Sequence, residues 1–266
     1  EAVVRSNEEG TKKLSFYLHM PFCKRLCHYC GCNSYIMPSS GDTVAKYIDA
    51  IHKEIDLVTA LIDKSRPISQ IHFGGGSPTA MPSSVLKEIN EHLLSLFPTI
   101  DKPEIAIECN PGYLTEEDWI NLTNSHFNRF SIGIQDLDDK VLKTVGRTPS
   151  NLPLETIISI LRNAGATINM DFLFGLPYQT PESFAKNIER AIALHPDRLV
   201  TFSYGHVPWV FKRQQILEKH GLPQPEIKQQ MYNKAATLLH EAGYKSIGLD
   251  HFVLPDDELY KALEQG

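Results

Sequence analysis

The chain has 266 residues, of which 42% are hydrophobic and 22% charged, and its formal net charge is −6. This length suffices for one large domain with a substantial core, and the composition is that of an ordinary globular protein. The negative charge argues against nucleic acid as a partner, and no apolar run approaches the roughly 20 residues that span a bilayer.

Short apolar runs that alternate with helical patterns predict a parallel sheet with outer helices. The predicted strands are 15–19, 68–73, 104–108, 129–134, 167–172, 198–203 and 245–249. Helices are expected from residues 43, 83, 115, 180 and 226 onward, with Asp42 as the N-cap of the first and Pro181 in the first turn of the fourth. Six or seven such units make an α/β fold of the partial (β/α)6 barrel type, with a doubly wound open sheet as the alternative.

The strongest chemical signal directly follows the first predicted strand, in the run Cys23-Lys-Arg-Leu-Cys27-His-Tyr-Cys30-Gly-Cys32. This clustering does not resemble a disulfide framework and favours a cytoplasmic metal or cluster site. Thiolates suit iron–sulfur clusters or zinc, and three of them can bind three irons of a cubane while leaving the fourth iron open. Structural zinc pairs usually have two to four residues between their ligands, whereas one separates Cys30 from Cys32. The spacing therefore favours a [4Fe–4S] cluster on Cys23, Cys27 and Cys30, with a zinc-binding module as the alternative.

Other candidate site residues follow the ends of later strands, where parallel α/β folds place their active residues. The run Gly74-Gly75-Gly76-Ser77-Pro78 would let the backbone approach a ligand, although such runs are often only tight turns. Glu108 ends the third strand, where a buried acid is costly unless it is paired, so it either contacts a ligand or forms a salt bridge. Gln135 and Asp136 end the fourth strand and Asp171 lies in the fifth, where each could instead cap a helix.

Remaining polar and cysteine side chains carry weaker signals. Three histidines lie near strand ends and could line a pocket, but none pairs with a second ligand in a recognised metal motif: His72, His206 and His251. Cys109 is expected to pack in the core. Lys24 and Arg25 are expected to be exposed, since long cations usually are.

These motifs together resemble the radical SAM superfamily and, more narrowly, the oxygen-independent coproporphyrinogen III oxidases. The resemblance covers nearly the whole chain, and it includes the cysteine run with its flanks and four further segments: Ser131-Ile-Gly-Ile-Gln-Asp136, Asp171-Phe-Leu-Phe-Gly-Leu-Pro177, Pro196-Asp-Arg-Leu199 and Gly248-Leu-Asp-His-Phe252. Related haem chaperone-like proteins share the three cluster cysteines, but typically have an aromatic residue at the position of Cys32 and Ser at that of Asp136. A haem chaperone without decarboxylase activity is therefore the second alternative.

The resemblance implies an activity and its cofactors. Two propionate side chains of coproporphyrinogen III would be oxidatively decarboxylated to vinyl groups, giving protoporphyrinogen IX in oxygen-independent haem biosynthesis. The implied cofactors are a [4Fe–4S] cluster and two molecules of S-adenosylmethionine (SAM). The first SAM would chelate the open iron, and its cleavage would give a radical that removes hydrogen from the propionate β-carbon.

The same resemblance assigns residues to these cofactors. Tyr17, Gly75 and Glu108 match contacts to the first SAM, and Cys32 would be a catalytic thiol that does not bind the cluster. The residues that match contacts to the second SAM are Tyr29, Gly76, Ser77, Gln135, Arg147, Asp171 and Gly205. The family usually has Thr at the position of Ser77, often Phe at Tyr29 and often Ala at Gly205.

The expected organisation is a flexible N-terminal arm over residues 1–14, a radical SAM partial barrel over 15–252, and a segment 253–266 that begins a truncated C-terminal domain or linker. By resemblance, the protein is expected to be a cytoplasmic monomer. It would receive electrons from a low-potential donor such as flavodoxin or ferredoxin.

Overall fold

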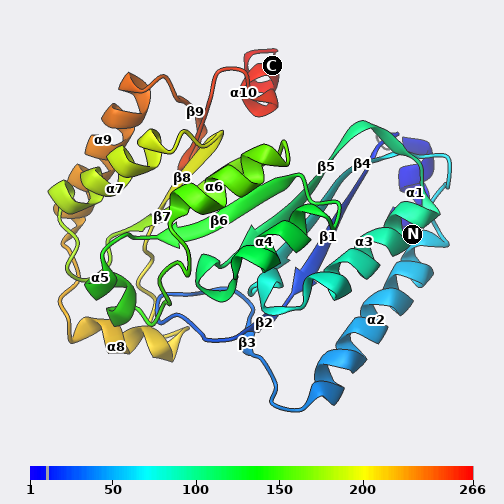
Figure 1. Ribbon diagram of the computed structural model, residues 1–266, viewed down its shortest axis with the longest axis horizontal. Helices are drawn as coiled ribbons and strands as arrows, with labels where there is room; N and C mark the ends of the chain where they lie inside the picture. The colour runs from blue at the N-terminus through cyan, green and yellow to red at the C-terminus, as the bar shows by residue number, and fades with distance from the viewer. Residues whose placement is uncertain (10–11, 266) are drawn as a thin grey trace.

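The computed structural model describes residues 1–9 and 12–265, and its centre is one eight-stranded sheet (Figure 1). Six of the strands are parallel and neighbour one another in chain order: β1 (Leu14–Met20), β4 (Ile68–Gly75), β5 (Thr99–Cys109), β6 (Arg129–Gln135), β7 (Thr167–Phe174) and β8 (Arg198–Ser203). Two short antiparallel strands, β10 (His251–Val253) and β9 (Lys245–Gly248), extend the sheet beyond β8. Since β1 and β9 are the two ends of this sheet, the barrel is open, which confirms the predicted partial (β/α) barrel.

Helices cover the outer face of the sheet (Figure 1). They are α2 (Gly41–Thr59), α3 (Ser83–Leu96), α4 (Glu116–Thr123), α6 (Leu154–Asn163), α7 (Pro181–Ala193) and α9 (Pro225–Glu241). Thr115 caps α4 with a reciprocal capping box, and Thr180 does the same for α7, where Pro181 occupies the first turn as expected. The prediction for Asp42 is wrong, because α2 begins after Ser40 and places Asp42 inside its first turn.

Shorter elements lie in the connections and at the two ends of the chain. They are α1 (Ala2–Glu9), β2 (Phe22–Cys23), β3 (Tyr35–Ile36), α5 (Asp139–Thr144), α8 (Gln215–Glu218), α10 (Glu258–Gln265) and the 3₁₀ turns Pro78–Ala80, Pro111–Tyr113 and Lys212–Gln214. Within the predicted flexible arm, residues 2–9 instead form α1. Asn7 ties this helix to the body: its amide donates to the Leu61 carbonyl at 3.0 Å and accepts from the Asp63 N–H at 3.0 Å.

The C-terminal end of the sheet also differs from the prediction. The run expected to continue the parallel series forms β9, which pairs antiparallel with β10. The three-residue strand β10 itself was not predicted. The expected domain boundary after Phe252 falls inside β10, which packs antiparallel to β8.

The strands present apolar side chains to the helices and polar side chains to the barrel interior. Phe73, Phe130 and Phe172 are fully buried in the hydrophobic core that the helices cover. Alternate residues on the same strands, such as His72 and Asp171, line the interior, because successive side chains of a strand point to opposite faces. Among the described residues, no helix is both long and apolar enough to cross a membrane.

Candidate active site

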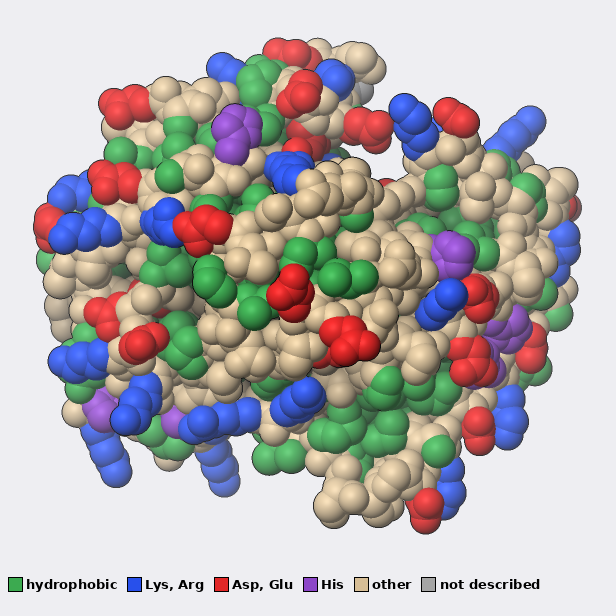
Figure 2. All heavy atoms as spheres, in the orientation of Figure 1, with side chains coloured by type: hydrophobic (Ala, Val, Ile, Leu, Met, Phe, Trp, Pro, Cys, Tyr) green, Lys and Arg blue, Asp and Glu red, His purple; other side chains and the backbone are tan. Residues whose placement is uncertain are grey.

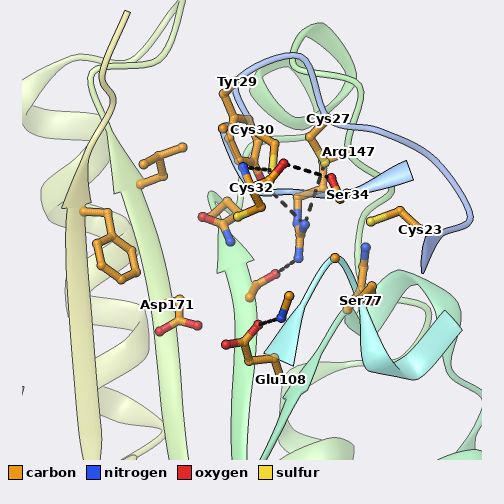
Figure 3. Close-up of a pocket in the computed structure, with 18 of the residues that line it drawn as sticks. Cys23, Cys27, Tyr29, Cys30, Cys32, Ser34, Ser77, Glu108, Arg147 and Asp171 are labelled. Carbon is orange, nitrogen blue, oxygen red and sulfur yellow. Dashed lines mark hydrogen bonds between the residues drawn. The ribbon is translucent and has the colours of Figure 1, made fainter. Parts of the chain in front are cut away.

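A cavity of about 600 Å³ opens at the carboxyl ends of the parallel strands, and the cysteine loop after β1 crosses its mouth (Figure 3). Every residue predicted to bind the cluster or a SAM molecule lines this cavity except Tyr17, and Cys32 lines it as well. Cys23 and Cys27 are buried, Cys30 is half-buried and Cys32 is exposed. The structure therefore brings together side chains that come from six different strands and the turns that follow them.

The four cysteines of the loop line one cavity without forming a site for a single metal ion. Within residues 1–9 and 12–265, no three His, Cys, Asp or Glu side chains converge closely enough to hold one metal ion. A cubane binds each thiolate through a different iron, so its ligands lie farther apart than those of a zinc ion. Cys32 faces Cys30, and its backbone N–H lies 3.4 Å from the Cys30 sulfur.

The thiols differ in how easily they lose a proton. The hydrogen bond from Cys32 lowers the pKa of Cys30 to about 6, against the opposing effect of burial. Burial, followed by the neighbouring Cys30 and Cys27, raises the pKa of Cys23 to about 11. Because clusters bind thiolates, Cys30 needs less adjustment than Cys23 to serve as a ligand.

Arg147 joins the cysteine loop to the sheet. Its Nη1 lies 3.8 Å from the Cys27 sulfur and 3.3 Å from the Tyr29 hydroxyl, and its Nη2 donates to the Gly133 carbonyl on β6 (Figure 3). A buried guanidinium at this place supplies positive charge next to a predicted cluster ligand.

Two further tethers hold the loop. The Tyr113 hydroxyl accepts from the Arg25 N–H at 3.0 Å and donates to the Arg25 carbonyl at 3.2 Å. The His28 N–H donates to the Val145 carbonyl at 2.8 Å. As expected, the side chains of Lys24 and Arg25 are exposed.

Glu108 and the glycine run form one contiguous wall of the cavity. The Gly75 N–H donates to Glu108 Oε2 at 3.2 Å, and His72 Nε2 lies 3.1 Å from Glu108 Oε1. A Cβ at Gly74 would lie 2.7 Å from Glu108 Oε1 and 2.9 Å from the Tyr17 ring, so a larger residue there would displace one of these two side chains. Ser77 follows, with its hydroxyl 3.2 Å from that of Thr79.

Tyr17 lies at the margin of this wall. Its side chain is 60% exposed on the edge strand β1. Its ring stacks on that of His72 with 5.8 Å between centroids, and its hydroxyl lies 3.1 Å from His19 Nδ1.

Asp171 faces the cavity from β7 and is held by two neighbours. The Ser131 hydroxyl donates to Oδ2 at 2.8 Å, and the Asn169 amide donates to Oδ1 at 2.7 Å. Burial raises the pKa of Asp171 to about 6 despite both hydrogen bonds. The other strand-end acid, Asp136, is buried away from the cavity, where it accepts from the Asp138 N–H at 2.7 Å and the Gln179 amide at 2.6 Å.

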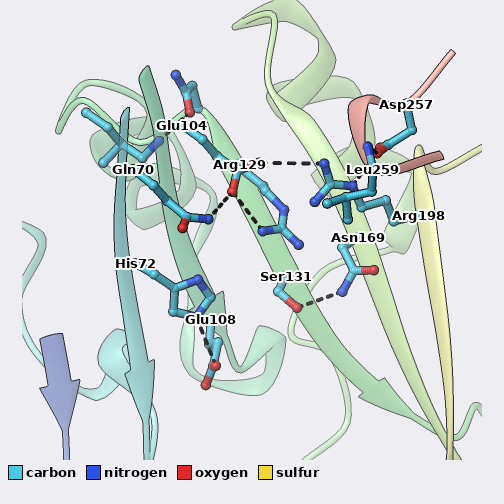
Figure 4. A network of polar contacts seen from close by, with 12 residues as sticks. Gln70, His72, Glu104, Glu108, Arg129, Ser131, Asn169, Arg198, Asp257 and Leu259 are labelled. Carbon is cyan, nitrogen blue, oxygen red and sulfur yellow. Dashed lines mark hydrogen bonds and ion pairs between the residues drawn. The ribbon is translucent and has the colours of Figure 1, made fainter. Parts of the chain in front are cut away.

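A half-buried polar network crosses the strands that line the cavity (Figure 4). Arg129 Nη1 lies 3.0 Å from Glu104 Oε1, which also accepts from the Gln70 amide at 2.7 Å. Arg198 Nε lies 2.6 Å from Asp257 Oδ2, so residues beyond β10 also take part in this network. His72 and His251 line the cavity, whereas His206 does not and instead contacts the Tyr204 hydroxyl at 2.8 Å.

Sequence reasoning missed several residues that shape the site. Ser131 and Asn169 could have been found, because each lies two residues before an inward-facing residue of its strand, Gly133 and Asp171. Tyr113 gives no such signal, since its contact with the cysteine loop depends on the tertiary fold.

Comparisons with known proteins agree with this arrangement. A family model described as Radical SAM superfamily matches residues 17–191. The chain is 38% identical over 269 residues to an oxygen-independent coproporphyrinogen III oxidase of Pseudomonas aeruginosa, covering 99% of this chain and 58% of that protein. It is 36% identical over 267 residues to the protein of that name from Escherichia coli, covering 100% of this chain and 57% of the relative.

A solved structure is similar over the same range. The coproporphyrinogen III oxidase HemN from Escherichia coli, described as a radical SAM enzyme, superposes with a TM-score of 0.90 at 34% identity, covering 99% of this chain and 61% of that one. The chain thus spans a little more than half the length of the curated relatives that it matches.

Proposed function

This chain belongs to the radical SAM superfamily, and from that premise we propose that it oxidatively decarboxylates two propionate side chains of coproporphyrinogen III, giving protoporphyrinogen IX. The observation that carries the proposal is the cysteine loop, which places three thiols and a separate fourth thiol, Cys32, on one cavity at the barrel mouth. The names and nearly full-chain similarity of the coproporphyrinogen III oxidases support this substrate.

We assign the cluster to Cys23, Cys27 and Cys30, since these three thiols line the cavity in a chain of the radical SAM superfamily. When bound, the cluster and SAM supply a one-electron cleavage that yields a carbon radical able to remove a hydrogen atom. Each propionate then loses a β-hydrogen atom, carbon dioxide and one electron as it becomes a vinyl group, so an external electron acceptor is required.

The chain's own residues position the reactants. Glu108, fixed by His72 and the Gly75 N–H, would present its carboxylate to the first SAM, beside the ring of Tyr17. A hydrogen bond to a charged acceptor is stronger than one to a neutral acceptor. The contact with the Glu108 carboxylate would therefore also orient the cofactor. Arg147 would keep Tyr29 and Cys27 in place.

We assign a second SAM to residues farther along the cavity. The assigned residues are Tyr29, Gly76, Ser77, Gln135, Arg147, Asp171 and Gly205, and all of them line the cavity. Asp171 is their one carboxylate, and Ser131 and Asn169 hold it in place. The exposed Cys32 thiol also lines the cavity, and we propose that it donates a hydrogen atom or a proton to the substrate.

We further propose that a low-potential, acidic electron carrier such as flavodoxin or ferredoxin docks near the barrel mouth. Figure 2 shows Lys and Arg side chains gathered over α5 and α8, although the chain as a whole has a net charge of −6. Complementary charge of this kind speeds encounter with an acidic partner. The free thiols of all five cysteines support a reducing, cytoplasmic location, and we propose that the protein acts as a monomer.

An anaerobic assay tests the proposed function. After cluster reconstitution, iron, sulfide, SAM cleavage and protoporphyrinogen IX are measured with and without coproporphyrinogen III. Product formation coupled to SAM cleavage is expected. SAM cleavage without product would refute the decarboxylase while leaving the cluster assignment intact, and a colourless protein that contains zinc would refute the cluster assignment as well.

A further inference from the structure

The sheet does not close, yet the loops that follow its first and last parallel strands meet across the mouth. The cysteine loop follows β1, at one end of the sheet, and residues 204–214 follow β8, near the other end. No backbone ladder joins these two ends within the described residues, because β1 pairs with β4 alone and β9 with β10 alone. Among the described residues, no backbone–backbone hydrogen bond joins the cysteine loop to residues 204–214 either, so side-chain contacts hold the loop from this side.

Gln214 makes the first of these contacts. Its side chain is 1% exposed, and its amide nitrogen donates to the Tyr29 carbonyl at 3.0 Å and to the Gly205 carbonyl at 3.2 Å. Its amide oxygen accepts from the Val207 N–H at 2.6 Å. Both amide hydrogens are thus used, and one of them joins the cysteine loop to the segment after β8.

Arg213 makes the second contact. Its Nε and Nη2 both donate to the Cys30 carbonyl, at 3.1 and 2.7 Å. The ring of Phe211 packs against Gly31, where an added Cβ would lie 3.0 Å from the ring. Three residues of one segment therefore contact three consecutive residues of the cysteine loop. One of the contacted residues, Cys30, is a predicted cluster ligand, and Arg213 brings a positive charge beside it.

We propose that Arg213 and Gln214 are positioning residues that close the cysteine loop against the last βα unit, so that Gln214 governs retention of the cluster and Arg213 raises its reduction potential. This inference rests on the cluster site of the proposed function. Gln214 holds the loop because breaking its contacts would leave its own buried amide without hydrogen-bond acceptors. Arg213 acts through charge, since a nearby cation favours the cluster state that carries the extra electron.

The role of Gln214 is tested by Gln214→Glu, with Gln215→Glu as the matched control at the neighbouring exposed position. The carboxylate keeps the size of the side chain but replaces two donors by an acceptor. In the reconstituted chain, we expect Gln214→Glu to release iron to a chelator about tenfold faster than wild type, and Gln215→Glu to release it at the wild-type rate. Equal rates for the two variants would overturn this part. Thermal unfolding of the apoproteins, followed by circular dichroism, separates loss of these loop contacts from loss of the fold. Gln214→Glu is expected to unfold near the wild-type temperature.

The role of Arg213 is tested by the cluster's midpoint potential, a quantity that a purely structural contact would not move. Arg213→Gln is expected to shift the midpoint potential to a more negative value, whereas Arg213→Lys, which keeps the positive charge, should keep the midpoint potential near that of wild type. Lys212→Gln, which removes a charge from the exposed neighbour, should leave the midpoint close to wild type. An unchanged midpoint in Arg213→Gln would refute the electrostatic role. A wild-type chain that acquires no cluster would instead refute the proposed function itself, so the two failures are distinguishable.

Discussion

Replacing Asp171 by Asn should stabilise the folded protein at neutral pH, while weakening the contact with the second SAM that we propose for this residue. Burial raises the pKa of this carboxyl from its ordinary value of 3.8 to about 6 in the folded chain. A raised carboxyl pKa means that the folded state favours the protonated form. Its contribution to stability is therefore present in full below about pH 4, and it is lost as the pH rises through about 6.

The magnitude follows from that shift. A difference of about 2 pKa units corresponds to about 3 kcal/mol at neutral pH. Because Asp171 lines a cavity that opens to water, we reduce this figure to about 1–2 kcal/mol, which would raise the unfolding temperature by about 2–8 °C. The substitution keeps the size of the side chain, and the remaining amide oxygen can still accept a hydrogen bond from Asn169.

Thermal unfolding of the apoprotein at pH 7.5 and at pH 4.5 checks this reasoning. Asp171→Asn should exceed wild type clearly at pH 7.5, and its advantage should shrink as the pH falls toward 4. Asp256→Asn, at an exposed position, controls for the change in net charge and should behave like wild type. An Asp171→Asn variant that is no more stable than wild type at pH 7.5 would refute the argument, as would an advantage that does not depend on pH.

Four further outcomes are expected. Replacing any one of the three proposed cluster ligands by Ala should abolish the brown colour and SAM cleavage, and a variant that kept about four irons per chain would remove that residue from the ligand set. Cys32→Ser should keep iron, sulfide and SAM binding but lose most product formation, whereas near-normal turnover would show that this thiol only packs. Glu108→Gln should weaken SAM binding about tenfold in equilibrium binding, because a charged acceptor is lost, and an unchanged affinity would contradict its assignment. Trp119→Ala should lower the free energy of unfolding by about 3–5 kcal/mol. Trp119→Phe should lower it much less, since the buried indole N–H has no hydrogen-bond partner within the described residues. Similar losses for the two variants in a denaturant titration would contradict this expectation.

The main strands could be predicted because each carries its own local signal. Phe73, Phe130 and Phe172 lie in short apolar runs, and such runs are typical of strands buried between a barrel interior and outer helices. The strand β10 has three residues and α1 is largely polar, so the hydrophobic pattern of neither segment can be distinguished from that of a loop. Both elements owe their place to tertiary contacts, such as those of Asn7 with residues 61–63.

The site was predictable to the extent that its residues are close in sequence or lie at strand ends. The cysteine run and the glycine run are local motifs, and the carboxyl ends of parallel strands converge. The role of Asp136 could not be separated from that of Gln135 by sequence, because only the structure shows that it faces Gln179 and not the cavity. The contacts of Arg213 and Gln214 join residues 183 and 185 positions apart, and no local pattern reports such a separation.

That separation also has a consequence for synthesis of the chain. A ribosome that adds about 5–20 residues per second needs roughly 10–40 seconds to travel from the cysteine loop to the segment that grips it. During this interval the nascent thiols are in place, but the wall supplied by the last βα unit does not yet exist. The cysteine loop therefore stays accessible to cluster-delivery factors, and equally to oxidants, until the later segment emerges and folds against it.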